Sequence, residues 1–185
     1  SWTERCLCPR QSPWVCSMFW PSAAWDKLYH RSLFEGLRYP VGVVNEDLPV
    51  TYRLALKAGK VGMLDKPVYY YFHRDGSITT AAFSPRAFQA SGHTKTMLEH
   101  IRREHPALTD HATCFHVNHL GYVCMIAELA GKDNLRQYAE DYAQKRKELR
   151  SFLPFILKSP LLKRKDRLTW ITICLGCYGS LRKVY

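Results

Sequence analysis

The sequence has 185 residues, of which 46% are hydrophobic and 13% aromatic, and its formal net charge is +11. This length and composition are sufficient for the packed core of one ordinary domain, so wholesale disorder is excluded. The uncharged run at residues 168–181 is shorter than the roughly 20 residues of a membrane-spanning helix. Most of the net positive charge lies in residues 143–185, which contain eleven Lys and Arg against two acids. The basic character therefore indicates what this segment binds, rather than what residues 1–142 bind.

The first third of the chain is predicted to be mixed in structure. Residues 1–24 show neither the period of a strand nor that of a helix, which predicts an irregular segment and suits the ragged start of a longer protein. A short helix is predicted over Trp25–Gly36, where apolar residues have helical spacing, and Val41–Val44 is predicted as a brief strand or a loop. A second helix is predicted from Leu48 to a left-handed stop at Gly59.

Two short strands are predicted next, at residues 60–64 and 67–73. In the aromatic run of the second strand, alternate side chains lie on opposite faces, and burial on both faces is the simplest interpretation. Arg74 and Ser77 follow on a turn. There they either contact a phosphate or a sugar hydroxyl, or are simply solvated.

The pattern is helical from residue 84 onwards. Glycine and aspartate at the expected positions mark where helices stop and start. The sequence predicts one helix ending near His105, a second from about Thr109 to Ala130 with Gly131 as its stop, and a third capped by Asp133.

The tail, residues 154–185, places apolar and aromatic residues between basic clusters. A helix of this kind suits the headgroup region of an anionic leaflet, where each basic residue contributes on the order of 1 kcal/mol. A terminal helix packed on the core with a charged outer face fits the pattern equally well. The basic residues adjoin an apolar helix rather than an aromatic stacking platform, so no nucleic-acid partner is predicted.

Cysteine and histidine spacing predicts no metal site. Seven cysteines form no regular disulfide framework, and four lie in apolar surroundings, which favours free thiols in a reducing compartment. His116 and His119, with Cys114, form one set of candidate metal ligands, but no further ligand stands at the spacing that zinc sites use. A second set, Cys6, Cys8 and Cys16, has the same weakness.

The acidic pair Glu46-Asp47 stands where an apolar run ends and a helical pattern begins. Asn45 or Asp47 suits the N-cap of that helix, and Pro49 is compatible with its first turn. A carboxylate at such a junction can also accept a proton from a substrate hydroxyl. Residue chemistry by itself favours capping over catalysis.

Residues 25–79 resemble the later half of a bacterial family 2 glycosyltransferase of the capsular or exopolysaccharide type, which has the GT-A fold. The resemblance is carried by motifs in a compatible order. They are W-x-K-L-Y with Trp25, Lys27, Leu28 and Tyr29, the pair Glu46-Asp47, the Ala-Gly-Lys-Val link, and the Y-Y-Y run with Arg74, Ser77 and Ile78. The helical remainder is similar to the C-terminal extension of that group.

The resemblance implies an α/β class (an α+β fragment), namely the later half of a GT-A-like domain with short strands, followed by a helical extension. It also implies inverting transfer of a sugar from a nucleotide-sugar donor to a glycan or lipid-linked acceptor. Asp47 is then the general base, Glu46 holds Asp47 or the acceptor, and Trp25 and Lys27 line the acceptor side. Arg74 and Ser77 are assigned to the donor diphosphate.

The resemblance divides the chain into residues 1–24, an acceptor-side part at 25–83, a helical extension at 84–153 and the basic tail at 154–185. A divalent metal, Mg or Mn, is expected for the full-length family, but its Asp-x-Asp motif does not occur in this chain. We therefore expect the chain alone to be inactive. The expected location is cytoplasmic, peripheral at the inner face of the cell membrane through the tail. The alternative is a non-catalytic basic module that docks on an anionic membrane or a partner protein.

Overall fold

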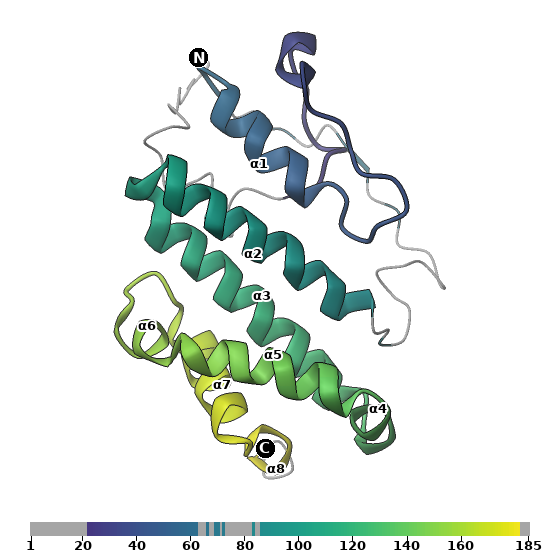
Figure 1. Cartoon of the computed structure of the whole chain (residues 1–185), viewed down its shortest axis with the longest axis vertical. Helices are drawn as coiled ribbons and strands as arrows, with labels where there is room; N and C mark the ends of the chain where they lie inside the picture. Colours follow the sequence, from purple (N-terminus) through teal and green to yellow (C-terminus); the bar gives the residue numbers. More distant parts are fainter. Residues whose placement is uncertain are drawn as a thin grey trace. The chain divides into compact units, whose positions relative to one another are not determined.

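The structure is a computed structural model that describes residues 22–62, 66, 69–70, 72, 83 and 86–181. The chain divides into two compact units (Figure 1). Unit 1 comprises Ser1–Ala81 and Thr96–Ala112, and unit 2 comprises Ala82–Lys95 and Thr113–Tyr185.

Helices account for the regular structure in these ranges. Two are short 3-10 helices and the others are α-helices of very different length. In chain order they are η2 (Arg31–Phe34), α1 (Leu48–Lys57), α2 (Arg86–Glu104), η3 (Pro106–Leu108), α3 (Thr109–Leu129), α4 (Lys132–Gln137), α5 (Ala139–Ser151), α6 (Leu153–Lys158), α7 (Arg164–Leu175) and α8 (Tyr178–Leu181).

The predicted α/β class with short strands is wrong, because no strand forms in the described parts of the chain. Val41–Val44 forms bends and turns, and Val61 makes only an isolated bridge. Tyr70 and Phe72, expected in a buried strand, are 88% and 82% exposed. A strand is stable only when neighbouring strands pair with its backbone and its side chains are covered, and neither condition is met by these residues. The other residues of the two predicted strands lie outside the described residues.

The helix predicted over Trp25–Gly36 is also wrong, because only η2 forms there. His30, at its start, is extended, and its Nδ1 accepts the backbone N–H of Ser32 over 3.4 Å. This local bond satisfies a free N–H of the short turn, and the helix starts at Arg31, six residues later than the apolar spacing suggested. Gly36 then adopts a positive φ of 74° and redirects the chain.

Helix α1 is confirmed near its predicted position, but its end differs from the prediction. It ends at Lys57, and the C-cap residue is Ala58 in extended conformation, not a left-handed Gly59. Its apolar side is buried in unit 1, with Leu54 completely inaccessible. Tyr52 on α1 meets the imidazole of His100 edge-on, with ring centroids 5.6 Å apart.

The helix boundaries predicted around residue 105 and at Gly131 are confirmed. Helix α2 ends at Glu104, before Pro106, and α3 ends at Leu129, followed by Gly131 with a φ of 100°. The prediction of one continuous helix capped by Asp133 is wrong. Tyr138, with φ −115° and ψ 32°, separates α4 from α5, and the N-cap of α4 is Gly131.

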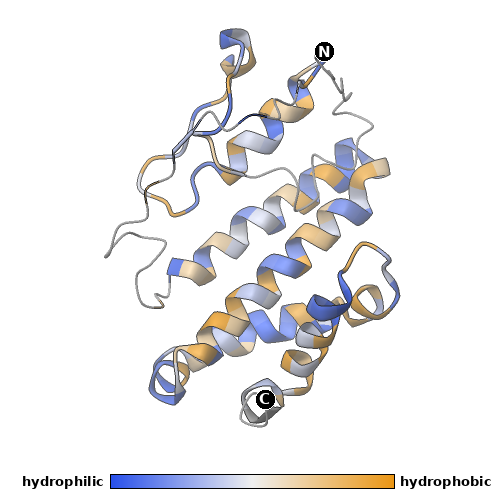
Figure 2. Ribbon diagram, turned by 180° about the vertical axis from the view of Figure 1, so that it is seen from behind, coloured by the Kyte–Doolittle hydropathy of each residue, from blue (hydrophilic) through white to orange (hydrophobic). Residues whose placement is uncertain are grey.

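The core of unit 2 is built from α3, α5, α6 and α7. Figure 2 shows hydrophobic and hydrophilic residues interspersed along these helices, as expected when one side of each is buried. Cys124 lies in this core, where burial raises the pKa of its thiol to about 12, so it behaves as a small apolar residue. The fully buried side chains of the cluster include Val117, Leu120, Leu149, Ile156 and Ile173.

Helix α7 is attached to α3 by a tryptophan that lies against a glycine. Trp170 is only 5% exposed, and its indole N–H donates to Oδ1 of Asn118 over 2.9 Å. A Cβ atom at Gly121 would lie 2.3 Å from a ring carbon of Trp170, so only glycine leaves room for this ring. The Trp170 side of α7 therefore belongs to the core of unit 2.

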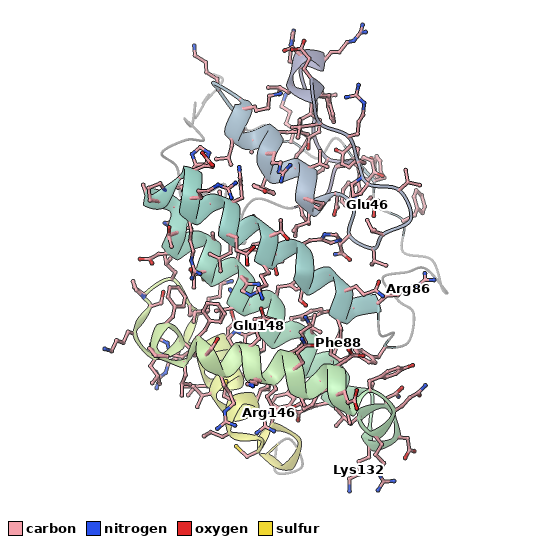
Figure 3. The ribbon with its side chains drawn as sticks, viewed as in Figure 1. Glu46, Arg86, Phe88, Lys132, Arg146 and Glu148 are labelled. Carbon is pink, nitrogen blue, oxygen red and sulfur yellow. The ribbon has the colours of Figure 1, made fainter. Side chains whose placement is uncertain are left out.

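Arg146 on α5 donates hydrogen bonds to backbone carbonyl groups at the C-terminal end of α7. Its Nε donates to the carbonyl of Ile173 over 2.9 Å, and an Nη donates to that of Cys174 over 3.2 Å. Figure 3 shows this side chain between α5 and α7. Because the last carbonyls of a helix lack intrahelical partners and carry negative partial charge, the guanidinium is well placed to stabilise α7.

These contacts decide between the two interpretations of the tail pattern for part of its residues. Trp170, Ile173 and Cys174 are buried in the protein and are not available to a membrane, whereas Leu168 and Leu175 are exposed. Within the described ranges, no helix is both long enough and apolar enough to cross a bilayer.

A polar network lies inside unit 2 around His116, which is 1% exposed. Its Nδ1 is 2.7 Å from Oγ1 of Thr94, and its Nε2 is 3.5 Å from a carboxylate oxygen of Glu148. The ammonium groups of Lys95 and Lys145 lie 3.7 and 3.8 Å from the same carboxylate. The network joins α2, α3 and α5, so the carboxylate of Glu148 helps to position three helices.

His119, on the same helix as His116, makes unit 2 sensitive to acid. Burial, together with His116, His93 and Lys145, lowers the pKa of His119 to about 4. A lowered pKa gives stability that is complete above the unfolded value near 6.5 and is lost as the pH falls towards the folded value. We expect the free energy of unfolding to fall on the order of 3 kcal/mol between pH 7 and pH 4 through this group.

Chemical denaturation of the 185-residue chain and of its His119→Leu variant across this pH range checks the expectation. The leucine variant should lose less stability on acidification, because its side chain takes up no proton. Parallel pH profiles for the two proteins would contradict the assignment to His119.

Candidate functional site

The acidic pair lies at the turn that leads into α1, and Figure 3 labels Glu46 there. Asn45 has a positive φ of 57°, which turns the chain just before the pair. This is an uncommon conformation that asparagine tolerates better than most residues. Asp47 occupies the N-cap position of α1 with helical φ and ψ, and its side chain makes no capping hydrogen bond. The side chain of Asp47 is therefore not used to cap the helix.

Proline explains in part why α1 needs no side-chain cap from Asp47. Pro49, in the first turn, has no N–H to satisfy. The N–H of Leu48 is bonded to the carbonyl of Asn45 over 3.2 Å, and that of Thr51 to the carbonyl of Asp47 over 2.8 Å. Backbone hydrogen bonds thus stabilise the start of α1, so the carboxylate of Asp47 is not needed to cap it.

The carboxyl group of Asp47 is half-buried and only partly satisfied. Its Oδ1 atom is inaccessible to solvent and has no hydrogen-bond partner among the described residues. Burial, followed by the charge of Glu46, raises the pKa of Asp47 above its ordinary value. The backbone N–H groups of Leu48 and Asp47 and the ammonium of Lys27 act in the opposite direction without cancelling the rise. A carboxylate in this state is a better proton acceptor than an exposed aspartate.

Two tyrosines from earlier in the chain lie close enough to sense this carboxylate. Burial and neighbouring groups, Asp47 among them, raise the pKa of Tyr29 to about 12. Burial and then the charge of Asp47 raise the pKa of Tyr39. Both phenols therefore remain protonated at neutral pH and can donate hydrogen bonds near Asp47. Neither tyrosine was predicted to belong to the site, although Tyr29 lies in the W-x-K-L-Y motif.

Thr51 holds the first turn of α1 in place beside Asp47. It is 1% exposed, and its hydroxyl lies 2.8 Å from the carbonyl oxygens of both Ser22 and Asp47. The hydroxyl links the segment before Trp25 to the first turn of α1. No motif marked this residue in advance, because its role depends on a contact with a segment 29 residues earlier in the chain.

Trp25 and Lys27, predicted on the acceptor side, belong to the same unit as Asp47. Trp25 is 48% exposed and stacks on Tyr69, with ring centroids 4.5 Å apart and an angle of 27° between the rings. Lys27 donates to the carbonyl of Ala23 over 2.7 Å and pairs with Asp26. Its charge acts on Asp47, as the pKa of that group shows. The structure thus brings Lys27, Glu46 and Asp47 into one electrostatic group.

The remaining predicted site residues, Arg74 and Ser77, lie outside the described residues. In the part of the chain that is described, no three His, Cys, Asp or Glu side chains are grouped to hold a metal ion. The acidic pair and Asp26 do not form such a group, so these residues do not fit a divalent metal centre.

A stretch of 57 residues is 40% identical to glycosyltransferase GlyA of Streptococcus pneumoniae serotype 4. The stretch covers 31% of this chain and 8% of that protein, so the chain spans only a small part of the length of this relative. No protein-family model matches the sequence, and no solved structure matches it. The similarity relates part of the chain to a glycosyltransferase.

Proposed function

We propose that this chain forms the acceptor-side part of a family 2 glycosyltransferase that acts in the synthesis of a cell-surface polysaccharide. It would transfer a sugar from a nucleotide-sugar donor to a hydroxyl of a glycan or lipid-linked acceptor, with inversion at the anomeric carbon. Two lines of support are independent of each other. One is the partial similarity to a glycosyltransferase, and the other is the state of the Asp47 carboxylate.

The observation that carries the proposal is the buried Oδ1 of Asp47 without a hydrogen-bond partner. An aspartate that served only the helix start would bond the free N–H groups of the first turn. Leaving a buried polar atom unsatisfied costs free energy, and such costs are typical of functional sites. An acceptor hydroxyl would satisfy this oxygen once the residues that cover it move apart, because Oδ1 is inaccessible to solvent in this structure.

In the proposed reaction Asp47 is the general base. It takes the proton of the acceptor hydroxyl as that oxygen forms a bond to the anomeric carbon, while the bond from that carbon to the diphosphate oxygen breaks. The nucleoside diphosphate leaves with the electron pair of the broken bond. A positioned base of this kind typically contributes about 10²–10⁴-fold in rate.

The neighbours of Asp47 take supporting roles in this proposal. Burial and then the charge of Glu46 raise the pKa of Asp47, and the charge of Lys27 acts in the opposite direction. Trp25, which is 48% exposed, is proposed to contact a sugar ring of the acceptor. The protonated phenols of Tyr29 and Tyr39 orient the acceptor by donating hydrogen bonds. Arg74 and Ser77 are still proposed to contact the donor diphosphate.

The direct test is to graft residues 25–185 onto the nucleotide-binding half of a related glycosyltransferase. Transfer of a radiolabelled sugar from a panel of nucleotide-sugars to mixed glycan and lipid-linked acceptors is then measured. We expect transfer by the graft, and none by the 185-residue chain alone. A folded graft that binds nucleotide-sugar yet transfers nothing to any acceptor would contradict the proposal.

A further inference from the structure

Four leucines on one segment of unit 2 are exposed to solvent. Leu157 is 52% exposed at the end of α6, Leu161 is 37% exposed in the following loop, and Leu168 and Leu175 on α7 are 57% and 66% exposed. Single exposed leucines are ordinary, but four within residues 157–175 form a concentration that calls for an explanation.

On α7 these leucines share one side of the helix. Leu168 and Leu175 are seven residues apart, which places them at nearly the same angle around the axis. Arg164 and Lys165 precede Leu168 by four and three residues and lie on that side too. The opposite side carries Trp170 and Ile173, which are buried in the core.

The surroundings of the leucines are basic. Residues 153–175 contain five Lys and Arg and one acid, Asp166. In Figure 2 the hydrophobic residues of α6 and of the loop after it adjoin the hydrophilic start of α7. The four exposed cations of this segment are Lys158, Lys163, Arg164 and Lys165.

The leucines are presented on a fixed support rather than on a loose helix. Trp170 holds the middle of α7 against α3 through Gly121 and Asn118. Arg146 holds its carboxyl end through two carbonyls. Binding through this surface would therefore not require α7 to fold or to leave the core, which reduces the entropic cost of docking.

We propose that the basic leucine surface, defined by Leu157, Leu161, Leu168 and Leu175 with the four exposed cations, docks unit 2 on an anionic lipid bilayer. The cations pair with lipid phosphates, and the leucines enter the boundary between headgroups and acyl chains. The charge favours this occupant over an ordinary protein interface, because charged residues, lysine included, are depleted from the centre of such interfaces. The proposal goes beyond sugar transfer and does not depend on it.

The test is flotation of the full 185-residue chain with phosphatidylcholine vesicles, with and without phosphatidylglycerol. We expect binding only to the anionic vesicles, and release as salt is raised. Lys163→Gln with Lys165→Gln should weaken binding about 25-fold, since each cation contributes about fivefold. Leu168→Gln with Leu175→Gln should weaken it more than about tenfold by removing the apolar contact. All four side chains are exposed, so these variants leave the core unchanged.

Matched controls lie elsewhere in the same unit. Leu129→Gln changes a leucine on α3 that is 40% exposed, and Lys132→Gln with Arg136→Gln removes two exposed cations from α4. We expect the binding of both control proteins to be unchanged or nearly so. Equal weakening by control and test variants would overturn the proposed surface, and so would the absence of binding to anionic vesicles.

A further outcome would assign the surface to another occupant. The chain could self-associate in sedimentation equilibrium, lose this association in the Leu168→Gln, Leu175→Gln variant and fail to bind vesicles. In that case the surface joins two copies of the chain, and the lipid proposal is overturned. Vesicle binding is measured without any sugar donor, so its failure is distinct from failure of the proposed transferase activity.

Discussion

Asp47→Asn in the grafted enzyme is expected to lower sugar transfer by about 10²–10⁴-fold. Asparagine keeps the shape of aspartate but cannot take up the proton of the acceptor hydroxyl. The loss should appear in kcat, because an amide can still hold the acceptor by a hydrogen bond. Initial rates of transfer at saturating donor, over a range of acceptor concentrations, provide the measurement.

The pH profile adds a second check on Asp47. A general base must be ionised, so transfer by the parent graft should increase with pH through the raised pKa of this group. The residual activity of the Asp47→Asn graft should lack this acidic limb. A profile that is identical in both proteins would show that another group takes the proton.

Stability separates loss of chemistry from loss of fold. Because burial and Glu46 raise the pKa of Asp47, any stability it confers exists below its unfolded pKa of about 4 and is lost as the pH rises through the folded value. Removing the charge should therefore leave stability at neutral pH unchanged or slightly higher. An inactive Asp47→Asn graft with lowered stability would point to a structural role instead.

Two further variants show whether the effect is specific. Glu46→Gln keeps the side chain's length but removes the neighbouring charge, and we expect a smaller loss of transfer with the acidic limb shifted to lower pH. Asp133→Asn is the matched control, since the Asp133 side chain is 99% exposed on α4, in the other unit. This substitution should leave transfer unchanged.

Gly121→Ala is expected to destabilise unit 2 by about 1–3 kcal/mol, although alanine is the better helix former. Alanine in place of a helical glycine gains about 1 kcal/mol. Against this gain, the new Cβ would lie 2.3 Å from the indole of Trp170, a ring that is buried and hydrogen-bonded to Asn118. Overpacking costs about 1–3 kcal/mol or more, and losing the indole bond adds about 1 kcal/mol. Urea denaturation followed by circular dichroism provides the measurement.

Gly92→Ala on α2 is the matched control, because no atom lies within 4 Å of the position of its Cβ. This substitution should stabilise the chain by about 1 kcal/mol, opposite in sign to Gly121→Ala. In a Trp170→Leu background the Gly121→Ala substitution should cost less or become stabilising, because the ring is absent. Equal effects of Gly121→Ala with and without Trp170 would contradict the packing argument.

Several features of the candidate site could be predicted from the sequence, and others could not. The acidic pair was placed correctly at the entrance of α1, because a proline in the first turn and a helical pattern are local signals. The state of the carboxylate was not predictable. The pKa of Asp47 depends on burial and on the charge of Lys27, which lies about 20 residues earlier in the chain. The sequence by itself favoured a capping role, but the side chain of Asp47 makes no capping hydrogen bond. Tyr29, Tyr39 and Thr51 were missed for the same reason.

The sequence alone determined where the long helices end, at Glu104 before Pro106 and at Leu129 before Gly131, since these stops depend on the chemistry of one or two residues. Only the tertiary structure decided that the aromatic run forms no strand in its described residues, and that Trp170 and Ile173 are buried while Leu168 and Leu175 are exposed. Strand pairing and burial require partners from distant parts of the chain. An amphipathic pattern specifies that a helix has two sides, but not what covers each of them.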